Sequence, residues 1–507
     1  MTIAASIPSA RDEATSDRKA DPGRTGPGLW LWPSLVALAL TTYGLAEPLL
    51  GRDELVTWDV VNRTTGQILA TARNVDAVHT AYYLLMHFWV SLSGDSVTAL
   101  RVPSVLAAAG TAAVVALIGN RMFGRRAGIT GGMLFALLPA ASRYGQEARS
   151  YALVVFLVAL ATLLLLRALE EPRKPLRWVG YALTMAGVGL LHLIALCAVL
   201  GHACAVAAVR RRDRSLPWTY AAVLVAVGAC TAPLAVLGRS HAHRQLYWVP
   251  APDLWALFAL QRDVFASVFC AGAVTALALV AALSVPAGRE RTASVVPCAV
   301  LAVLPPVVVW LGSHGEVSYV RHQYVLFTLP FWAVLAGAGL AAVARSRKAV
   351  AAVLAVLAVL TWVDQRQMRG RFEHDVPVPL DYAAAARLIT RQYQPGDAVV
   401  YDRDNTWQLD GGVTYYLPPD VRMRDVFRAR RPVEINDLYV VPCTPSVSCL
   451  GPEERVWLVT QGVGDPDPLN ALSPDQASAL RLRYAADRGE SVTGITVTLL
   501  VRRGTGA

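Results

Sequence analysis

A series of long apolar segments is the feature that most constrains how this chain can fold. About eleven segments approach the 17 to 25 residues that a helix needs to cross a bilayer. Only 17% of the residues are charged, against about 25% in ordinary soluble domains. The pattern therefore predicts a polytopic α-helical membrane protein. The predicted segments are residues 29–50, 102–120, 128–142, 150–168, 178–191, 194–209, 216–237, 264–285, 293–312, 323–344 and 349–363.

Positive charge in the short connectors predicts the orientation of these segments. The connectors GNRMFGRRAG, LEEPRKPLRW, RRRDR, AGRERT and RSRK together carry 15 Lys or Arg against 4 Asp or Glu. Short cationic loops stay in the cytoplasm, so we expect a cytoplasmic N-terminus and outer loops at 51–101, 143–149, 238–263 and 313–322. With eleven spans, everything after Val363 also lies outside. The sequence thus predicts a multi-pass protein of the plasma membrane.

The two ends of the chain differ in composition from the membrane part, residues 29–363. Residues 1–28 are polar and are predicted to be a disordered cytoplasmic tail. The apolar segment that follows has no small-residue cleavage site, so we expect an uncleaved anchor. Residues 364–507 hold 17 basic and 19 acidic residues and the N-terminal tail is balanced, so the positive excess of the chain belongs to the membrane part. A nucleic-acid partner is not expected, because it would favour a basic patch in a soluble domain.

Residues 364–507 alternate between helical and strand-like patterns. The stretch DYAAAARLITRQY has helical periodicity and is followed by Pro395 and Gly396, whereas DAVVYD, ERVWLVTQ and GITVTLLVRR are typical of strands. We expect a small extracytoplasmic α/β domain. It shows no catalytic motif and no phosphate-binding glycine loop.

Two of the seven cysteines, Cys443 and Cys449, lie six positions apart in a polar, turn-rich segment. A disulfide between them requires an oxidising compartment, which agrees with an extracytoplasmic domain. No histidine or further cysteine lies nearby in sequence, so a metal site there is not expected. The other cysteines lie inside apolar segments, where a free thiol behaves as a small hydrophobe.

Acidic residues follow the first apolar segment on the predicted outer side. Asp53 and Glu54 are adjacent, and Asp59 follows about a turn later. The simplest interpretation is that these carboxylates are solvated, as most charged residues are. The alternative is a functional site, because carboxylates near an apolar boundary have raised proton affinity and can act as general bases.

A second charged junction, RYGQEARSYAL, lies between two apolar segments at residues 143–153. Arg143 precedes Glu147 by four positions and Arg149 follows it by two. One interpretation is an i,i+4 ion pair that contributes a few tenths of a kcal/mol. The other is a functional site, because charge so close to hydrocarbon is expensive unless it is paired or used.

Six short motifs occur in order between about residues 29 and 345: GRDE, SLSGDSVTALRVPSVLAA, NRMFGRRAG, RYGQEARSYAL, LLHLIALCAVLGH and RHQYVLFTLP. Together they resemble the GT-C superfamily of membrane glycosyltransferases, in particular glycosyltransferase family 39. That group includes protein O-mannosyltransferases and the aminoarabinose transferase of lipid A. The resemblance implies an inverting glycosyltransferase that moves a sugar from a polyprenyl-phosphate donor to an acceptor hydroxyl on the outer face.

The same resemblance implies roles for particular residues. By this resemblance Asp53 would be the general base for the acceptor hydroxyl with Glu54 beside it, and Glu147 matches a second acidic position that in the superfamily helps to bind metal or to orient the acceptor. The leaving phosphate needs no general acid, but it needs cations around its oxygens. A divalent metal, if one is used, would be held by Asp53 and Glu147. The implied substrate contacts are Arg149, Tyr144, Gln146, His192, Arg244, Arg321, His322 and Tyr324.

Some residues depart from the family pattern or have a simpler interpretation. Gln323 stands where the family commonly has an arginine before Tyr324, and Arg321 lies two residues earlier. His192 lies in an apolar run, where a lone histidine is more often a structural hydrogen-bonding group. The same holds for His79 and His87.

Two other classes of function stay open at this point. One is a transporter of lipid-linked glycans or polysaccharide, because charge within spans also marks substrate paths. The other is a non-catalytic membrane scaffold whose outer domain binds a partner. For the enzyme, mannose is the first expectation by family frequency, and the acceptor is a protein, a glycolipid or a cell-wall glycan. The enzyme hypothesis requires Asp53 and Glu147 to converge on one side of the bilayer.

Overall fold

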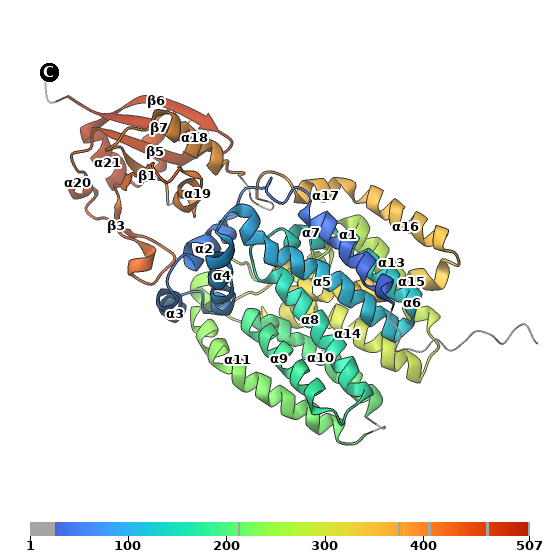
Figure 1. Ribbon diagram of the computed structural model, residues 1–507. Coiled ribbons are helices and arrows are strands. Elements are labelled where there is room, and N and C mark those ends of the chain that lie inside the picture. Colours follow the sequence, from blue (N-terminus) through green and yellow to red (C-terminus); the bar gives the residue numbers. More distant parts are fainter. Residues whose placement is uncertain are drawn as a thin grey trace, which may run out of the picture.

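A bundle of helices and a smaller part built around a sheet make up the molecule (Figure 1). The computed structural model describes residues 26–210, 213–373, 376, 378–403, 407–462 and 466–504. The tail predicted over residues 1–28 therefore falls almost entirely outside the described residues. The first described element is a short 3-10 helix, η1 (Pro27–Leu29).

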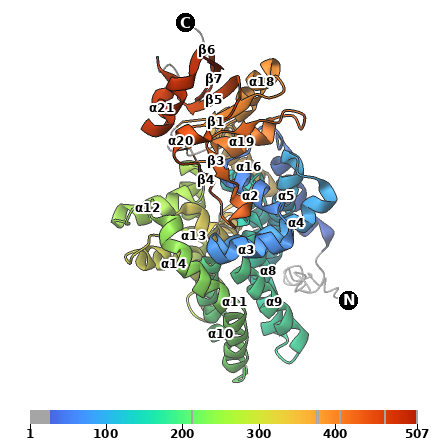
Figure 2. The ribbon, with the colours of Figure 1, turned by 90° about the vertical axis from the view of Figure 1, so that its left-hand side faces the viewer.

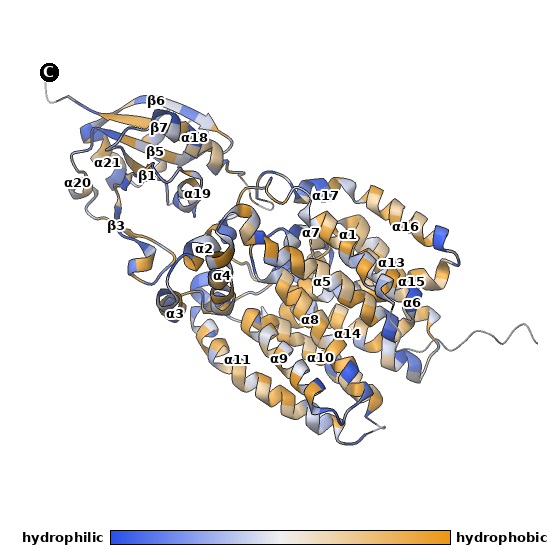
Figure 3. Ribbon diagram, in the orientation of Figure 1, coloured by the Kyte–Doolittle hydropathy of each residue, from blue (hydrophilic) through white to orange (hydrophobic). Residues whose placement is uncertain are grey.

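Each of the eleven predicted apolar segments contains a helix of the bundle. The α-helices are α1 (Leu31–Thr42), α5 (Val97–Phe123), α6 (Arg125–Leu137), α7 (Pro139–Gly145), α8 (Tyr151–Glu170), α9 (Pro175–Leu191), α10 (Ala198–Val209), α11 (Leu216–Leu246), α12 (Leu254–Asp263), α13 (Val268–Ser284), α14 (Arg289–Gly312), α15 (Leu329–Val343), α16 (Arg347–Leu360) and α17 (Trp362–Met368). The 3-10 helices η3 (Leu193–Cys197) and η4 (His322–Thr328) precede α10 and α15. In Figure 3 these helices are mostly apolar in colour, whereas the connectors and the C-terminal part carry more polar residues.

The number of spans is not confirmed as eleven. Among the described residues, five helices are long and apolar enough to cross a membrane, and up to seven if each of two bent helix pairs is one span. Several predicted segments contain helices that are shorter than the roughly 20 residues a span needs; α6, for example, has 13 residues. It begins after Gly124, whose φ is +91°, and ends before Pro139. The apolar helices fit a membrane protein, but apolar runs alone do not fix where each helix breaks.

Helices α5, α6 and α15 pack at the centre of the bundle. A Cβ atom on Gly337 of α15 would collide with the backbone of Gly131 of α6. The hydroxyl of Thr130 donates to the carbonyl of Gly337 at 2.8 Å. Such close approach through small residues is typical of packed helices in membranes. By contrast, α11 lies at the periphery, because only 11% of its apolar stretch is buried.

The outer loop predicted at residues 51–101 is largely helical. It contains α2 (Arg52–Val61), α3 (Thr65–Asn74), the 3-10 helix η2 (Ala77–His79) and α4 (Thr80–Ser93). Figure 2 shows α2, α3 and α4 at the end of the bundle that faces the C-terminal part. Leu85, Phe88 and Leu92 of α4 are exposed, which fits a helix that lies along the membrane interface.

The C-terminal part has a five-stranded sheet in the order β2-β1-β5-β7-β6. Strands β2, β1 and β5 are parallel, and β7 and β6 continue the sheet antiparallel. The predicted helix corresponds to α18, and the three predicted strands correspond to β1, β5 and β7. The elements are α18 (Tyr382–Gln392), β1 (Ala398–Tyr401), α19 (Leu409–Tyr416), β2 (Arg424–Asp425), β3 (Arg428–Arg430), η5 (Pro432–Glu434), β4 (Val441–Pro442), α20 (Ser446–Cys449), β5 (Arg455–Gln461), η6 (Pro468–Ala471), α21 (Pro474–Arg483), β6 (Tyr484–Val492) and β7 (Ile495–Arg502). Cys443 and Cys449 form a disulfide, as predicted.

Candidate active site

The start of α2 separates the two adjacent carboxylates, Asp53 and Glu54. Gly51 is extended and precedes the helix, and the backbone N–H of Gly51 donates to Oε2 of Glu54 at 3.0 Å. Successive residues on a helix point in directions about 100° apart, so the two side chains have different surroundings. Glu54 is buried, whereas the side chain of Asp53 is 43% exposed.

Glu54 is held by Arg101 of α5. The guanidinium donates to both carboxylate oxygens, with Nε 2.9 Å from Oε1 and Nη2 2.7 Å from Oε2. The backbone N–H of Ala148 donates to Oε1 at 2.8 Å. Although burial raises the pKa of the Glu54 carboxyl, Arg101 and the backbone donors outweigh burial and hold the pKa below its usual value. With two donors on each oxygen, Glu54 is suited to joining segments and poorly suited to accepting a proton from substrate.

Arg149 lies on the other side of the pair, next to Asp53. Its Nε is 3.9 Å from Oδ2 of Asp53. Its Nη2 lies 2.8 Å from Nε2 of His79, and its Nη1 donates to the hydroxyl of Tyr83 at 3.4 Å. Arg149 is only 5% exposed. The guanidinium therefore has a fixed position from which it faces the exposed carboxylate.

Asp76 contacts Tyr83 and His79, the two residues that hold the guanidinium of Arg149. It adopts a left-handed conformation, with φ of 56°, at the start of η2. The hydroxyl of Tyr83 donates to its Oδ2, and the amide of Gln245, at the end of α11, donates to its Oδ1 at 2.9 Å. His79 Nε2 is 3.8 Å from Oδ1. Burial and, to a smaller extent, the positive charge of Arg149 lower the pKa of His79 to about 4. The imidazole is therefore neutral at neutral pH.

Glu147 also reaches this end of the bundle, but it faces Arg143. The two side chains form an i,i+4 ion pair at 3.1 Å, as the simpler interpretation of this stretch predicts. Burial raises the pKa of Glu147 to about 7, with Arg143 opposing the shift. The neighbouring Gln146 donates to the carbonyls of Thr41 at 2.9 Å and Tyr43 at 2.7 Å. Its contacts in the structure are thus with the end of α1.

Four more of the predicted residues gather in an aromatic cluster. The rings of His192 and Tyr324 lie 5.2 Å apart between centroids, and those of Tyr144 and His322 lie 6.3 Å apart. Tyr151 lies within 5.7 Å of Tyr144 and 6.2 Å of His192. The cluster brings together side chains from α7, α8, η4 and the turn after α9.

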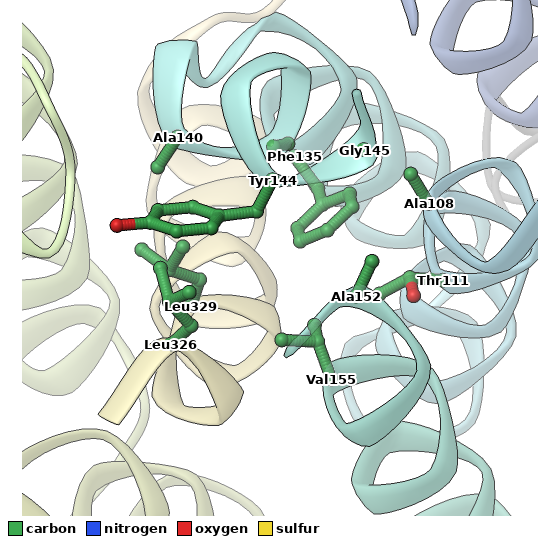
Figure 4. A pocket seen from close by; sticks show the side chains of 11 residues that line it. Ala108, Thr111, Phe135, Ala140, Tyr144, Gly145, Ala152, Val155, Leu326 and Leu329 are labelled. Carbon is green, nitrogen blue, oxygen red and sulfur yellow. The ribbon is translucent and has the colours of Figure 1, made fainter. Parts of the chain in front are cut away.

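Below Tyr144 is a small apolar pocket of about 20 Å³. Figure 4 shows the tyrosine ring beside Leu326 and Leu329, with its hydroxyl pointing away from Phe135. The pocket has room for about one water molecule, and most of the residues that line it are apolar. It is therefore a packing gap rather than a substrate site.

The last two predicted cations have different partners. Arg321 lies over the ring of Trp248, 5.0 Å from its centroid, and its Nε has no hydrogen-bond partner among the described residues. Arg244 is paired with Asp437 of the C-terminal part at 2.8 Å. Arg321 is thus the more available cation, whereas the guanidinium of Arg244 is already occupied.

Contacts from the C-terminal part reach the segment that carries Asp53. Glu373 accepts from both the backbone N–H and the Nε of Arg52, each at 3.2 Å. The hydroxyl of Tyr416 accepts from the backbone N–H of Leu50 at 3.0 Å. The C-terminal part is therefore attached to residues immediately before the exposed carboxylate.

Within the described ranges, no group of three or more His, Cys, Asp or Glu side chains could hold a metal ion. Of the two carboxylates that the resemblance suggests for a metal, Glu147 faces Arg143 and Asp53 faces Arg149. This donor set does not favour a divalent cation.

Comparison with known proteins identifies the fold of this chain. Residues 80–236 match the family described as dolichyl-phosphate-mannose-protein mannosyltransferase. No curated protein matches this sequence. ArnT from Cupriavidus metallidurans, solved bound to undecaprenyl phosphate, is similar with a TM-score of 0.60 and 15% identity, over 94% of this chain and 98% of ArnT. The chain has a GT-C fold.

Two other GT-C proteins are similar at lower scores. The archaeal oligosaccharyltransferase AglB from Archaeoglobus fulgidus gives a TM-score of 0.49 at 11% identity, over 93% of this chain and 74% of AglB. The arabinofuranosyltransferase AftD from Mycobacteria gives 0.48 at 15% identity, over 94% of this chain and 42% of AftD. The match to ArnT confirms the GT-C fold that the sequence resemblance implies, and this fold fits a multi-pass membrane protein.

In this GT-C chain the two predicted acidic junctions meet at one end of the bundle, because Glu54 binds the backbone beside Glu147. Sequence reasoning missed Arg101, Asp76 and Tyr83. The signal for Arg101 was available, since it is an arginine at the edge of an apolar segment that needs a carboxylate partner. Asp76 and Tyr83 carry no comparable signal.

Proposed function

We propose that this chain is an inverting glycosyltransferase that moves a sugar from a polyprenyl-phosphate donor to an acceptor hydroxyl on the outer face of the plasma membrane. The observation that carries the proposal is the half-exposed carboxylate of Asp53, 3.9 Å from the fixed guanidinium of Arg149. It lies in a GT-C fold similar to that of a protein solved with undecaprenyl phosphate.

In the proposed reaction Asp53 is the general base. A hydroxyl is a poor nucleophile until a carboxylate accepts its proton. As Asp53 takes the proton, the acceptor oxygen bonds to the anomeric carbon. The bond from that carbon to the phosphate oxygen breaks, and its electron pair leaves with the phosphate. Attack opposite the leaving group inverts the anomeric centre.

The leaving phosphate gains charge as the bond breaks and needs fixed cations. Arg149 fits this role because Asp76, His79 and Tyr83 hold the surrounding network in place. Arg321 is the second proposed cation, because its Nε has no partner among the described residues. The aromatic cluster of Tyr144, His192, His322 and Tyr324 lies nearby and is proposed to contact the donor.

Glu54 has a supporting role in this proposal. Its carboxylate is saturated by Arg101 and two backbone donors, so it fixes the start of α2 and leaves proton transfer to Asp53. Glu147 is proposed to orient the acceptor. With a pKa of about 7, its carboxyl is partly protonated at neutral pH and can donate a hydrogen bond.

Mannose is the first proposed sugar, and the name of the family that matches residues 80–236 supports it. The proposed acceptor is a protein hydroxyl, a glycolipid or a cell-wall glycan. The C-terminal part is proposed to select the acceptor, because it contacts Arg52 and Leu50 next to Asp53. Truncation after Val363, followed by an acceptor-binding assay, tests that assignment.

The test of the proposed function compares Asp53→Asn with Glu47→Gln, an exposed carboxylate six positions earlier. Membranes that contain each variant are supplied with radiolabelled polyprenyl-phosphate mannose. Asp53→Asn is expected to insert normally and to lose transfer by about 10²- to 10⁴-fold, the range for a lost general base. Glu47→Gln is expected to retain it.

Transfer by Asp53→Asn at the wild-type rate would refute the base assignment. Mass spectrometry of envelope glycans and glycoproteins, with the chain present or absent, identifies the sugar and acceptor. If the chain were a transporter or a scaffold, purified membranes that contain it would attach no sugar to any acceptor.

A further inference from the structure

A cavity lies at the end of the bundle opposite Asp53, and the proposed reaction does not use it. Arg101 near the start of α5 contacts Glu54, and Arg121 near its end lines this cavity. Twenty residues of helix separate them by about 30 Å, close to the thickness of the hydrocarbon core. The cavity has a volume of about 810 Å³.

The floor of the cavity is apolar and its rim is charged. The lining comes from the ends of α5, α8, α10, α13 and α15 and from the start of α6 and α14. The apolar lining includes Met122, Phe123, Leu166, Leu169, Val209 and Val285. Arg121, Arg126, Glu170 and Glu290 provide the charged lining. An apolar floor below a charged rim is suited to an amphiphile with a charged head.

The charges of the rim are not locked in place. Arg121 pairs with Glu170 at 3.1 Å, but the side chains are 21% and 51% exposed. Arg126 is exposed and makes no ion pair within the part of the chain that the structure describes. Glu290 is also exposed. A guanidinium in such a position is available to a phosphate, which arginine binds through two parallel hydrogen bonds.

The surroundings make the rim more cationic than its own lining. Three of the cationic connectors, GNRMFGRRAG, LEEPRKPLRW and AGRERT, contribute residues to the lining, and together they hold 8 basic against 3 acidic residues. Basic pockets between helices on the cytoplasmic side favour anionic lipid head groups. A volume of this size is also in the range of small-molecule binding pockets.

We propose that this cavity binds an acidic phospholipid, with the lipid phosphate on Arg126 and Arg121 and an acyl chain on the floor formed by Met122, Phe123 and Leu166. Glu170 releases Arg121 when the phosphate enters. Glu290 opposes the head group and limits the affinity. The site is separate from the proposed active site and does not depend on its function.

Native mass spectrometry of the purified full chain tests the site. The protein is titrated with phosphatidylglycerol or with phosphatidylcholine of the same acyl chains. We expect about tenfold higher occupancy by phosphatidylglycerol, the ratio that 1.4 kcal/mol of preference produces. The double variant Arg121→Gln, Arg126→Gln is expected to lose this preference, and Glu290→Gln is expected to strengthen it.

The matched control is Arg345→Gln, an exposed arginine in a connector at the same end that does not line the cavity. It is expected to keep the preference. Equal occupancy by both lipids, an unchanged preference in the double variant or an equal loss in the control would each overturn the proposal. Thermal unfolding of every variant shows whether a loss of lipid reflects a loss of fold.

Discussion

The two ends of α5 carry the same kind of ion pair in opposite surroundings. Near the start of the helix, Arg101 and Glu54 pair at 2.7 Å with side chains 2% and 4% exposed. Near its end, Arg121 and Glu170 pair at 3.1 Å with side chains 21% and 51% exposed. The buried pair is completed by backbone groups, whereas the exposed pair has water as an alternative partner. Burial and additional donors therefore decide whether such a pair fixes a structure or stays free to bind.

The largest stability effect is expected from breaking the buried pair. Glu54→Gln leaves Arg101 buried without a counter-charge, although its bonds to the carbonyls of Leu45, Pro48 and Leu49 remain. Removing one partner of a buried pair costs about 3–5 kcal/mol. Thermal unfolding in detergent should show a much lower Tm for Glu54→Gln than for Asp53→Asn. An unchanged Tm would mean that this pair does not fix the start of α2.

A smaller effect is expected from pH, through Glu147. In the folded chain its pKa is about 7, raised from 4.5, so the folded state binds more protons than the unfolded state between these values. The free energy of unfolding should therefore fall as pH rises from about 4.5 to about 7, by on the order of 1–3 kcal/mol.

Unfolding curves of the wild type and Glu147→Gln at pH 5 and pH 7.5 measure this contribution. The wild type should lose stability relative to the variant as pH rises. Parallel changes in the two proteins would show that Glu147 titrates normally. This result would place its pair with Arg143 in the same class as the exposed pair of α5.

The smallest effect is expected from the exposed pair itself. Glu170→Gln should change the free energy of unfolding by less than about 1 kcal/mol, as for most surface ion pairs. Thermal unfolding under the same conditions as for Glu54→Gln provides the measurement. A loss similar to that of Glu54→Gln would remove the distinction between the two ends.

The sequence predicts most of what depends on local pattern. The helix and strands of the C-terminal part follow periodicity, and the Cys443–Cys449 disulfide follows from two cysteines six positions apart in a turn-rich segment. The convergence of Asp53 and Glu147 on one end of the bundle was also predictable, because connector charge places both residues on the same side. These features follow from periodicity, residue spacing and the distribution of charge, all of which the sequence displays directly.

The remaining parts of the site depend on contacts between distant residues. Asp76 lies in a polar loop and resembles any solvated aspartate until Gln245, 169 positions away, donates to it. The division of roles between Asp53 and Glu54 depends on which side of α2 faces Arg101. The sequence does not show which of two adjacent carboxylates faces Arg101. The number of spans is not confirmed for a related reason, because breaks such as the one between α6 and α7 depend on packing.

The hydrogen bond from Ala148 to Glu54 joins positions 94 residues apart. Because synthesis proceeds from the N-terminus, Glu54 is made and inserted before Ala148, the last of its hydrogen-bond donors, has been synthesised. Until residue 148 arrives, one lone pair of a carboxylate at the water boundary depends on solvent. The start of α2 should thus acquire its rigidity late in biosynthesis, after the segment that leads into α8 has taken its place.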